Sequence, residues 1–295
     1  MKIPTLPATL PATSLALLAI ALWSLLAALG LSLQHVPPFL LTGIALLIGS
    51  LPAWAFYQQW RVTLPALLLG IYGLFGFHFL LFIALRHAPP VEANLINYLW
   101  PLGIVVMAPL FLPNTTLRMP HVVAAFLGFA GACMAILGDG VMANGWRSLS
   151  EKGFAWGYIP ALGSAFIWAS YSLMSKRLVG TRHAFPTAAI GLFGLVSGLL
   201  SLACHAVLEP SMALQSKDWA LLVAIGLGPL GAAFYLWDAA LKKGDARRIG
   251  ILSYITPLAS TLLLVVSTGR SLTWSIGIAT LLILGAAVLG NQTKA

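Results

Sequence analysis

Long apolar segments limit what this chain can fold into more than any other feature. A helix needs about twenty apolar residues to cross a bilayer. Turn or charged residues divide the chain into ten segments of that kind: 13–33, 39–58, 64–85, 91–112, 120–138, 155–176, 185–206, 219–241, 247–267 and 274–291. Only 8% of the residues are charged, whereas about a quarter are charged in a soluble domain. The sequence therefore predicts an all-α integral membrane protein with ten transmembrane helices.

The positive charges predict how these helices are oriented. With the N-terminus placed in the cytoplasm, eleven basic residues face the cytoplasm: Lys2, Arg61, Arg118, Lys176, Arg177, Arg182, Lys242, Lys243, Arg247, Arg248 and Lys294. Five face the other side: Arg86, Arg147, Lys152, Lys217 and Arg270. Because cytoplasmic loops carry an excess of Lys and Arg, we expect both termini in the cytoplasm. The net charge of +9 then reflects membrane topology and not a nucleic-acid-binding surface.

The chain contains an internal repeat. Residues 78–102 align without a gap with residues 234–258, at a constant offset of 156. We therefore expect a first five-helix unit (residues 1–140), a connecting loop (141–154) and a second five-helix unit (155–295). An odd number of helices per unit makes the second unit inverted relative to the first. Inverted repeats are common in secondary transporters, which bind their substrate at the repeat interface. The expected fold is thus two inverted repeats around a central cavity.

Three patterns together resemble a known family. Each unit opens with a helix that carries a tryptophan near its middle, Trp23 and Trp168, and each has a later helix that contains Tyr-x-x-Pro. With the two tandem units, the chain resembles the EamA-type branch of the drug/metabolite transporter superfamily over nearly its whole length. The resemblance implies a bacterial inner-membrane exporter, working by alternating access on aromatic and other neutral amino acids. A monomer is sufficient, because the pseudo-symmetry is internal.

The positions of the charged residues limit which classes of substrate the protein can bind. All seven acids lie in loops or within a turn or two of the predicted helix ends, and no Lys or Arg lies in the middle of a predicted helix. A strongly anionic substrate needs buried basic groups, and a cationic drug needs a buried carboxylate. The substrate is therefore expected to be a small neutral or zwitterionic metabolite. Neutral sugars and nucleobases remain alternatives within the same superfamily.

The sequence gives less support to an enzyme or a scaffold protein than to a transporter. An integral-membrane enzyme needs a clustered nucleophile, acid/base pair or metal set, and the sequence has no HExxH motif and no paired carboxylates within a helix. The cysteines Cys133 and Cys204 form no metal-binding spacing. We therefore predict a transporter with no metal and no cofactor, whose partners are its small-molecule substrate and the lipid bilayer. A scaffold or insertion factor is a third possibility.

Two proline-containing helices carry the first candidate residues. Asn94, Asn97, Tyr98 and Pro101 are spaced to lie on one helical face, and the repeat places Ser253, Tyr254 and Pro257 correspondingly. Each proline leaves the carbonyl four residues earlier without its helical partner. Pro101 and Pro257 are therefore predicted hinges or kinks, and the freed carbonyls and neighbouring side chains are predicted substrate contacts. Packing between helices is the alternative role.

Aromatic residues and one histidine complete the predicted site. Trp23, Trp100 and Trp168 lie near the middle of predicted helices, where an interfacial belt does not explain them, whereas Trp237 lies near a helix end and is ambiguous. His78 can bind substrate, carry a proton, or be a buried structural histidine. The predicted substrate-binding residues are Trp23, His78, Asn94, Asn97, Tyr98, Trp100, Trp168, Tyr171, Ser253 and Tyr254.

Overall fold

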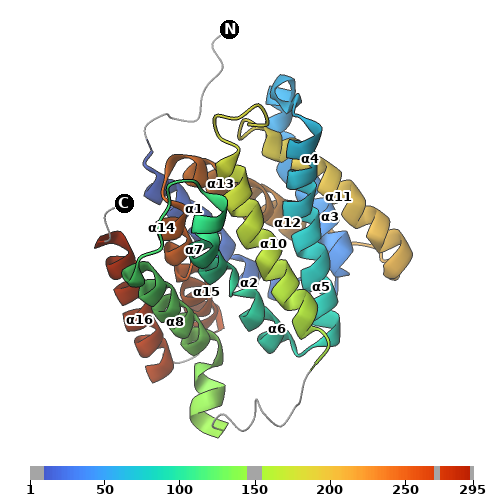
Figure 1. Ribbon diagram of the computed structural model, residues 1–295. Helices are drawn as coiled ribbons and strands as arrows, with labels where there is room; N and C mark the ends of the chain where they lie inside the picture. The colour runs from blue at the N-terminus through green and yellow to red at the C-terminus, as the bar shows by residue number, and fades with distance from the viewer. Residues whose placement is uncertain (1–9, 145–154, 269–272, 293–295) are drawn as a thin grey trace.

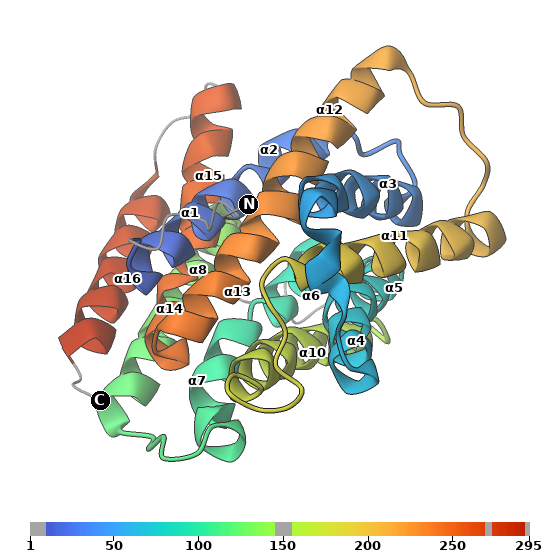
Figure 2. The ribbon, with the colours of Figure 1, turned by 90° about the horizontal axis from the view of Figure 1, so that it is seen from above.

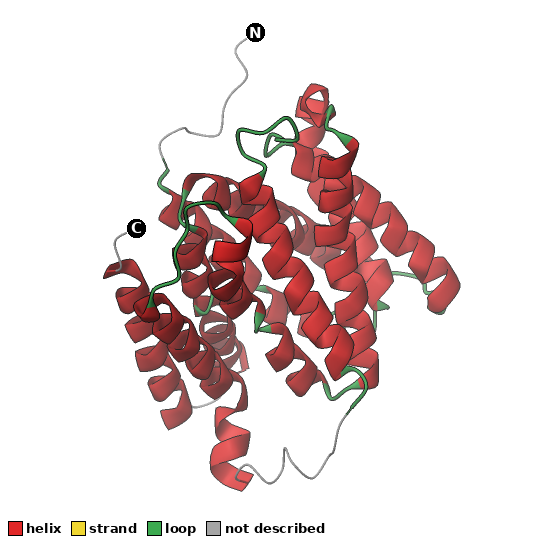
Figure 3. Ribbon diagram, in the orientation of Figure 1, coloured by secondary structure: helices red, strands yellow, loops and turns green. Residues whose placement is uncertain are grey.

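The described part of the chain is built from helices and loops. The computed structural model describes residues 10–144, 155–268 and 273–292 (Figure 1, Figure 3). Its first half contains α1 (Ala12–Ser24), α2 (Leu26–Leu31), α3 (Pro38–Ser50), η1 (Leu51–Trp60), α4 (Leu64–Ile71), η2 (Tyr72–Gly76), α5 (Phe77–His87), α6 (Pro90–Asn97), α7 (Trp100–Phe111) and α8 (Met119–Asn144). Its second half contains α10 (Tyr158–Arg177), α11 (Ala189–Leu208), α12 (Ser216–Leu227), η3 (Gly228–Ala232), α13 (Ala233–Lys243), α14 (Ala246–Leu252), α15 (Ile255–Thr268) and α16 (Trp274–Gln292).

Eight helical segments of the described residues are long and apolar enough to cross a membrane. Most of them combine consecutive elements, such as α1 with α2, α6 with α7 and α14 with α15. The other two predicted segments are helical as well. α10 has 20 residues, but four serines and a basic end reduce its apolar character, and α16 is apolar over Trp274–Gly290. The predicted all-helical membrane architecture is therefore confirmed, with eight segments that can cross a membrane among the described residues.

Two of the membrane-crossing helices are interrupted just before a proline. The break between α6 and α7 precedes Pro101, and the break between α14 and α15 precedes Pro257. Proline has no N–H, so the carbonyl four residues earlier loses its helical partner. In the second break this carbonyl, of Ser253, accepts a hydrogen bond from the amide of Thr256 at 3.0 Å instead. Both helices are thus interrupted before the proline, and this second carbonyl is satisfied within the backbone.

Two other helices contain a π-helical turn at matching positions. η2 lies between α4 and α5, and η3 lies between α12 and α13. The two turns are separated by 156 residues at both ends, as are α5 and α13, which is the offset of the sequence repeat. π-helical turns are rare and are frequent at functional sites. Each turn leads directly into a helix that contributes to the cavity described below.

Close contacts between glycines fix the packing of α3 against α11 and α12. A Cβ atom on Gly198 would lie 2.9 Å from the carbonyl oxygen of Gly43, and one on Gly49 would lie 2.7 Å from that of Gly226. Small residues let membrane helices approach closely. In Figure 2, α3, α4 and α11 lie on one side of the molecule, α8, α15 and α16 lie on the other, and α1 and α13 lie between them.

The basic helix ends gather at one end of the molecule. α7, α10 and α13 all end at the upper side in Figure 1, where α1 begins and α16 ends. Lys176 and Arg177 lie in the last turn of α10. Arg247 at the start of α14 binds both carboxylate oxygens of Asp245 and the carbonyl of Thr116 in the α7–α8 loop. At the opposite side α8 extends to Asn144, and residues 145–154 of the expected connecting loop 141–154 lie outside the described residues.

Candidate substrate cavity

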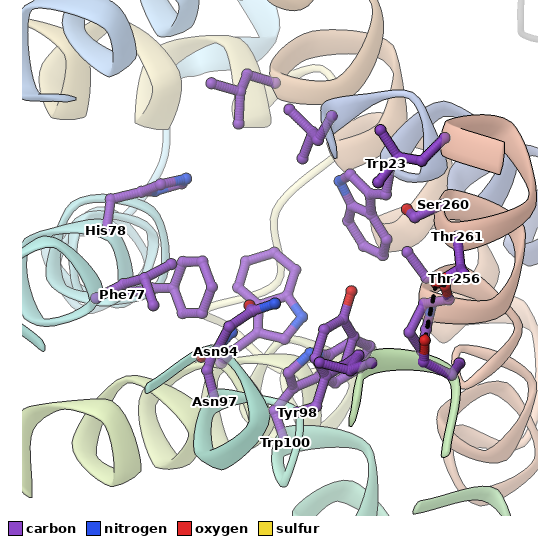
Figure 4. Close-up of a pocket in the computed structure, with 18 of the residues that line it drawn as sticks. Trp23, Phe77, His78, Asn94, Asn97, Tyr98, Trp100, Thr256, Ser260 and Thr261 are labelled. Carbon is purple, nitrogen blue, oxygen red and sulfur yellow. Dashed lines mark hydrogen bonds between the residues drawn. The ribbon is translucent and has the colours of Figure 1, made fainter. Parts of the chain in front are cut away.

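A cavity of about 670 Å³ lies between helices from both halves of the chain (Figure 4). Its walls come from α1, α3, α5, α6, α7, α8, α10, η3, α13, α15 and α16, with one residue from α2. Small-molecule sites are typically clefts of roughly 300–1,000 Å³ with mostly apolar walls and a few placed polar groups. The cavity therefore has the size and the composition expected of a site for a metabolite.

Seven of the ten predicted substrate-binding residues line this cavity, as does one of the two predicted hinge prolines, Pro257. The seven are Trp23, His78, Asn94, Asn97, Tyr98, Trp100 and Trp168. Figure 4 shows His78 of α5 directed toward the same space as Asn94 and Tyr98 of α6 and its C-terminal cap. The seven residues come from four separate parts of the sequence, and the fold brings them together around one volume. Pro101 lies one residue beyond a lining residue and is buried in the first turn of α7.

The other three predicted residues are packed away from the cavity. Tyr171 packs against Trp168 in a tilted arrangement, with ring centroids 5.4 Å apart, and fills the space over Gly73. Tyr254 is fully buried against Gly128. The hydroxyl of Ser253 donates to the carbonyl of Gly250 at 2.5 Å. The structure thus gives these three side chains packing roles, and we leave them out of the proposed site.

Four tryptophans from four helices cluster at one end of the cavity, and three of them, Trp23, Trp100 and Trp168, line it. Trp23 of α1, Trp100 of α7, Trp168 of α10 and Trp237 of α13 are all in mutual contact, with ring centroids between 5.2 and 6.5 Å apart. The indole N–H of Trp23 donates to the carbonyl of Pro229 in η3, and that of Trp237 donates to Ser172. Because each exposes 9% or less of its surface, this cluster closes the cavity on that side.

Several cavity residues escaped the sequence analysis. Phe234 and Phe77 line the wall near Trp168, with centroids 5.5 and 5.3 Å from it. Phe234 stands where the repeat aligns His78, and the two rings meet edge to face with centroids 6.2 Å apart. The offset of 156 is therefore a signal from which Phe234 could have been identified. Trp237 was ambiguous because it lies near a helix end, although α13 carries it into the tryptophan cluster.

A row of hydroxyl groups on α15 was also missed. Thr256, Ser260 and Thr261 line the cavity (Figure 4). Ser260 donates to the carbonyl of Ser24 at 3.0 Å, which ties α15 to α1. The hydroxyl of Thr256 is buried and has no hydrogen-bond partner among the described residues. It is therefore available to a ligand.

A buried polar network lies beyond the tryptophan cluster. Asp238 follows Trp237 on α13 and accepts hydrogen bonds from Ser175 at 3.0 Å, Thr187 at 2.6 Å and Lys242 at 2.6 Å. The ion pair of Asp238 with Lys242, four residues later on the same helix, is one part of a larger network. The network joins α13 to α10 and to the loop that precedes α11.

No charged side chain of the described residues lines the cavity. Its polar groups are imidazole, amide, indole, phenol and hydroxyl. No group of three or more His, Cys, Asp or Glu gathers anywhere in the described ranges. The cavity can bind small molecules with aromatic rings of different sizes through apolar contacts and hydrogen bonds. It provides no fixed counter-charge for them.

Membrane-crossing helices that enclose a buried cavity of metabolite size define the chain as a multi-pass membrane transporter. It belongs to the EamA-like transporter family, whose pattern matches residues 10–137 and again residues 155–291. The resemblance to the EamA-type branch is thereby confirmed. The family and its members are transporters and not enzymes.

Several known proteins are similar to this chain over most of its length. The aromatic amino acid exporter YddG of Ancylobacter novellus is 40% identical over 287 residues, which is 95% of this chain and 96% of that protein. An Escherichia coli K12 protein named as an uncharacterized inner membrane transporter, YhbE, is 26% identical over 203 residues, 68% of this chain and 59% of that protein. A crystal structure of a protein with 41% sequence identity superposes with a TM-score of 0.84, covering 94% of this chain and 95% of that one.

Proposed function

We propose that the protein exports small neutral or zwitterionic metabolites across the bacterial inner membrane, and that aromatic and other neutral amino acids are its substrates. The observation that carries the proposal is the cavity, which combines aromatic walls, neutral polar groups and no charged side chain among the described residues. The name of the relative from Ancylobacter novellus, an aromatic amino acid exporter, supports the same substrate class. The name of YhbE supports the inner membrane.

The chemistry of the cavity suits a zwitterion. An ammonium and a carboxylate cannot enter an apolar site without polar partners, because each unpaired buried charge costs several kcal/mol. The proposed substrate-binding residues are Trp23, His78, Asn94, Asn97, Tyr98, Trp100 and Trp168, joined by Phe77, Phe234 and Thr256. Neutral hydrogen-bonding groups hold a zwitterion less tightly than fixed charges. That favours release, which an exporter requires.

We further propose ten transmembrane helices in two inverted five-helix units, residues 1–140 and 155–295, joined by residues 141–154. Three observations support this division. The EamA pattern matches each unit separately, the two π-helical turns keep the offset of 156, and α10 has 20 residues, about 30 Å of helix. α1 begins on the same side of the molecule on which α16 ends (Figure 1). This favours an even number of membrane crossings, and it is consistent with both termini in the cytoplasm.

We propose alternating access as the transport mechanism, which the closure of one end of the cavity supports. The tryptophan cluster and the Asp238 network close the side on which α13 ends in basic residues, which is the proposed cytoplasmic side. The lining continues at the other side to Leu264 and Val265 of α15 and to Ser275 of α16. In the proposed cycle, α13 separates from α1 and α10 to admit substrate from the cytoplasm, with Pro101 and Pro257 as hinges.

The test is counterflow in liposomes that contain the purified protein. We expect exchange of labelled phenylalanine, competition by tryptophan and leucine, and poor competition by glutamate. Trp168→Ala in the cavity should weaken exchange, whereas Val207→Ala should not, because Val207 exposes 82% of its surface to the surroundings. Exchange of a neutral sugar or a nucleobase without exchange of any amino acid would overturn the proposed substrate class.

A further inference from the structure

His78 is held in one ring orientation and in one tautomer. Its Nδ1 lies 2.6 Å from the carbonyl oxygen of Leu74, which belongs to the π-helical turn η2. A carbonyl oxygen only accepts hydrogen bonds, so Nδ1 carries the proton. The flipped ring would place a carbon at this point, and carbon-to-oxygen contacts are about 3.3 Å or longer. The short distance therefore identifies the atom as nitrogen and the bond as Nδ1–H to carbonyl.

The other ring nitrogen is left as a hydrogen-bond acceptor. A neutral imidazole has one donor and one acceptor nitrogen, so the lone pair of His78 lies on Nε2. This atom makes no hydrogen bond to any described residue, while the ring lines the cavity. Figure 4 shows the imidazole extending from its helix into that space. The acceptor is thus presented to whatever occupies the cavity.

The surroundings of the ring favour its neutral form. His78 exposes 6% of its surface and packs against Phe77, Phe82 and Phe234, with ring centroids 5.0, 6.0 and 6.2 Å away. No carboxylate of the described residues lies within ion-pair distance of it. A buried charge without a partner is costly, so the imidazole stays neutral and Nε2 stays an acceptor.

Acceptor-only groups are scarce among the polar side chains around the cavity. Indole N–H groups only donate, while amide, phenol and hydroxyl groups can donate as well as accept. In the repeat, the position equivalent to His78 is Phe234, which has no acceptor. The imidazole acceptor of His78 therefore has no counterpart at the equivalent position of the second unit.

We propose that Nε2 of His78 accepts a hydrogen bond from the ammonium group of the substrate and is the residue by which the cavity recognises a primary amine. The inference rests on the proposed function, since it assumes an amino acid as the occupant. It assigns His78 the role of a specificity-determining residue rather than that of a proton carrier. A substrate that lacks the ammonium group gains nothing from His78.

The experiment measures the binding of three matched ligands to purified protein through the fluorescence of the cavity tryptophans. Phenylalanine carries both charges, phenethylamine carries only the ammonium group, and 3-phenylpropionate carries only the carboxylate. His78→Asn keeps a donor for the carbonyl of Leu74 but places no acceptor at the Nε2 position. His78→Gln extends an amide oxygen to about that position and is the matched control.

We expect His78→Asn to weaken the binding of phenylalanine and phenethylamine by about 10-fold or more, since hydrogen bonds to charged groups are among the stronger ones. Binding of 3-phenylpropionate should be unchanged in both variants, and His78→Gln should stay within a few-fold of the unaltered protein for all three ligands. Equal losses for all three ligands would make His78 a packing residue, and a selective loss of 3-phenylpropionate would make it a donor. Either result overturns the inference.

Nitrogen NMR of protein labelled in its histidines provides a test that does not depend on the folding of a variant at the site. The His78 signal, identified by its absence in His78→Gln, should show a protonated Nδ1 and an unprotonated Nε2. A protonated Nε2 contradicts the inference while leaving the proposed function intact. Unaltered protein that binds neither phenylalanine nor phenethylamine, yet exchanges another metabolite, contradicts the proposed function itself.

Discussion

Replacing Asp238 by asparagine removes one charge from the joint between α10 and α13 at nearly constant volume. The Asp238 carboxylate exposes 2% of its surface and accepts hydrogen bonds from Ser175, Thr187 and Lys242. An asparagine oxygen can still accept from the two hydroxyl groups. The ammonium group of Lys242, whose side chain is 16% exposed, then loses its counter-charge.

The expected loss of stability follows from the burial of the Asp238–Lys242 ion pair. Breaking a buried ion pair by removing one partner costs roughly 3–5 kcal/mol. Lys242 keeps two other interactions, with the carbonyl of Phe185 at 2.8 Å and with the ring of Phe185, whose centroid lies 4.0 Å away. We therefore expect Asp238→Asn to lower the free energy of unfolding by about 3 kcal/mol, at the low end of that range.

The assay is equilibrium unfolding in detergent micelles, arranged as a double-mutant cycle with Lys242→Met. The double variant should be more stable than Asp238→Asn alone, because it no longer buries an unpaired ammonium group. Lys243→Met is the matched control, since it removes the same charge one residue away from an exposed position. It should change the free energy of unfolding by less than about 0.5 kcal/mol.

Two results would refute the reasoning about this joint. The first is Asp238→Asn that unfolds like the unaltered protein. The second is a double variant that is destabilised by the sum of the two single changes, since strict additivity means that the residues do not interact. Transport by Asp238→Asn gives an independent readout. If the network must break for α13 to leave α10, counterflow should persist while the proposed cytoplasmic side becomes more accessible.

Two further predictions concern packing and pH. Gly49→Ala should cost about 1–3 kcal/mol, the range for overpacked sites, because its Cβ would meet backbone atoms at 2.7–2.9 Å; Gly277→Ala, with no atom within 4 Å, should be tolerated in the same unfolding assay, and equal effects would refute the close-contact account. Burial raises the pKa of Asp245, but hydrogen bonds and charge interaction with Arg247 outweigh burial and hold that pKa below its ordinary value. This stabilisation is complete above the unfolded pKa of about 3.9 and is lost as the pH falls through the lower folded value. The melting-temperature difference between the unaltered protein and Asp245→Asn, which keeps the helix cap, should therefore be constant from pH 7 to about pH 5 and shrink below about pH 4; a difference that shrinks near pH 6 would contradict the assignment.

The membrane class of the fold could be predicted because it depends on features that are local in sequence. Apolar segments of about twenty residues are contiguous, so their length and composition identify them without tertiary information. The sequence repeat is equally easy to recognise over its best-matching part, since residues 78–102 and 234–258 align without a gap. α10 shows the limit of this approach. Its serines lower its apolar character, although all four form hydrogen bonds to other side chains inside the protein. Sequence alone does not show that this face is buried.

The site was predictable in part, because helical spacing identifies a face but not what the face meets. Asn94, Asn97 and Tyr98 share a face on α6 and reach the cavity as predicted. Tyr254 stands at the matching position in the second unit, yet it packs over Gly128 of α8. A glycine on the neighbouring helix leaves room for that ring. Nothing in the local pattern around Tyr254 indicates this contact, because the two positions are more than a hundred residues apart.

The two π-helical turns explain how a repeated frame produces an asymmetric cavity. In each turn a carbonyl oxygen accepts a hydrogen bond from a side-chain N–H of the cavity wall. The carbonyl of Leu74 in η2 accepts from His78, and that of Pro229 in η3 accepts from Trp23. Both side chains are thereby fixed in orientation, although one presents an acceptor and the other an aromatic face. Because positions 78 and 234 carry different residues, His and Phe, a substrate meets an imidazole acceptor at this position from the first unit only. The amino group of a bound amino acid is therefore expected to stay on the same wall while the helices around it change position.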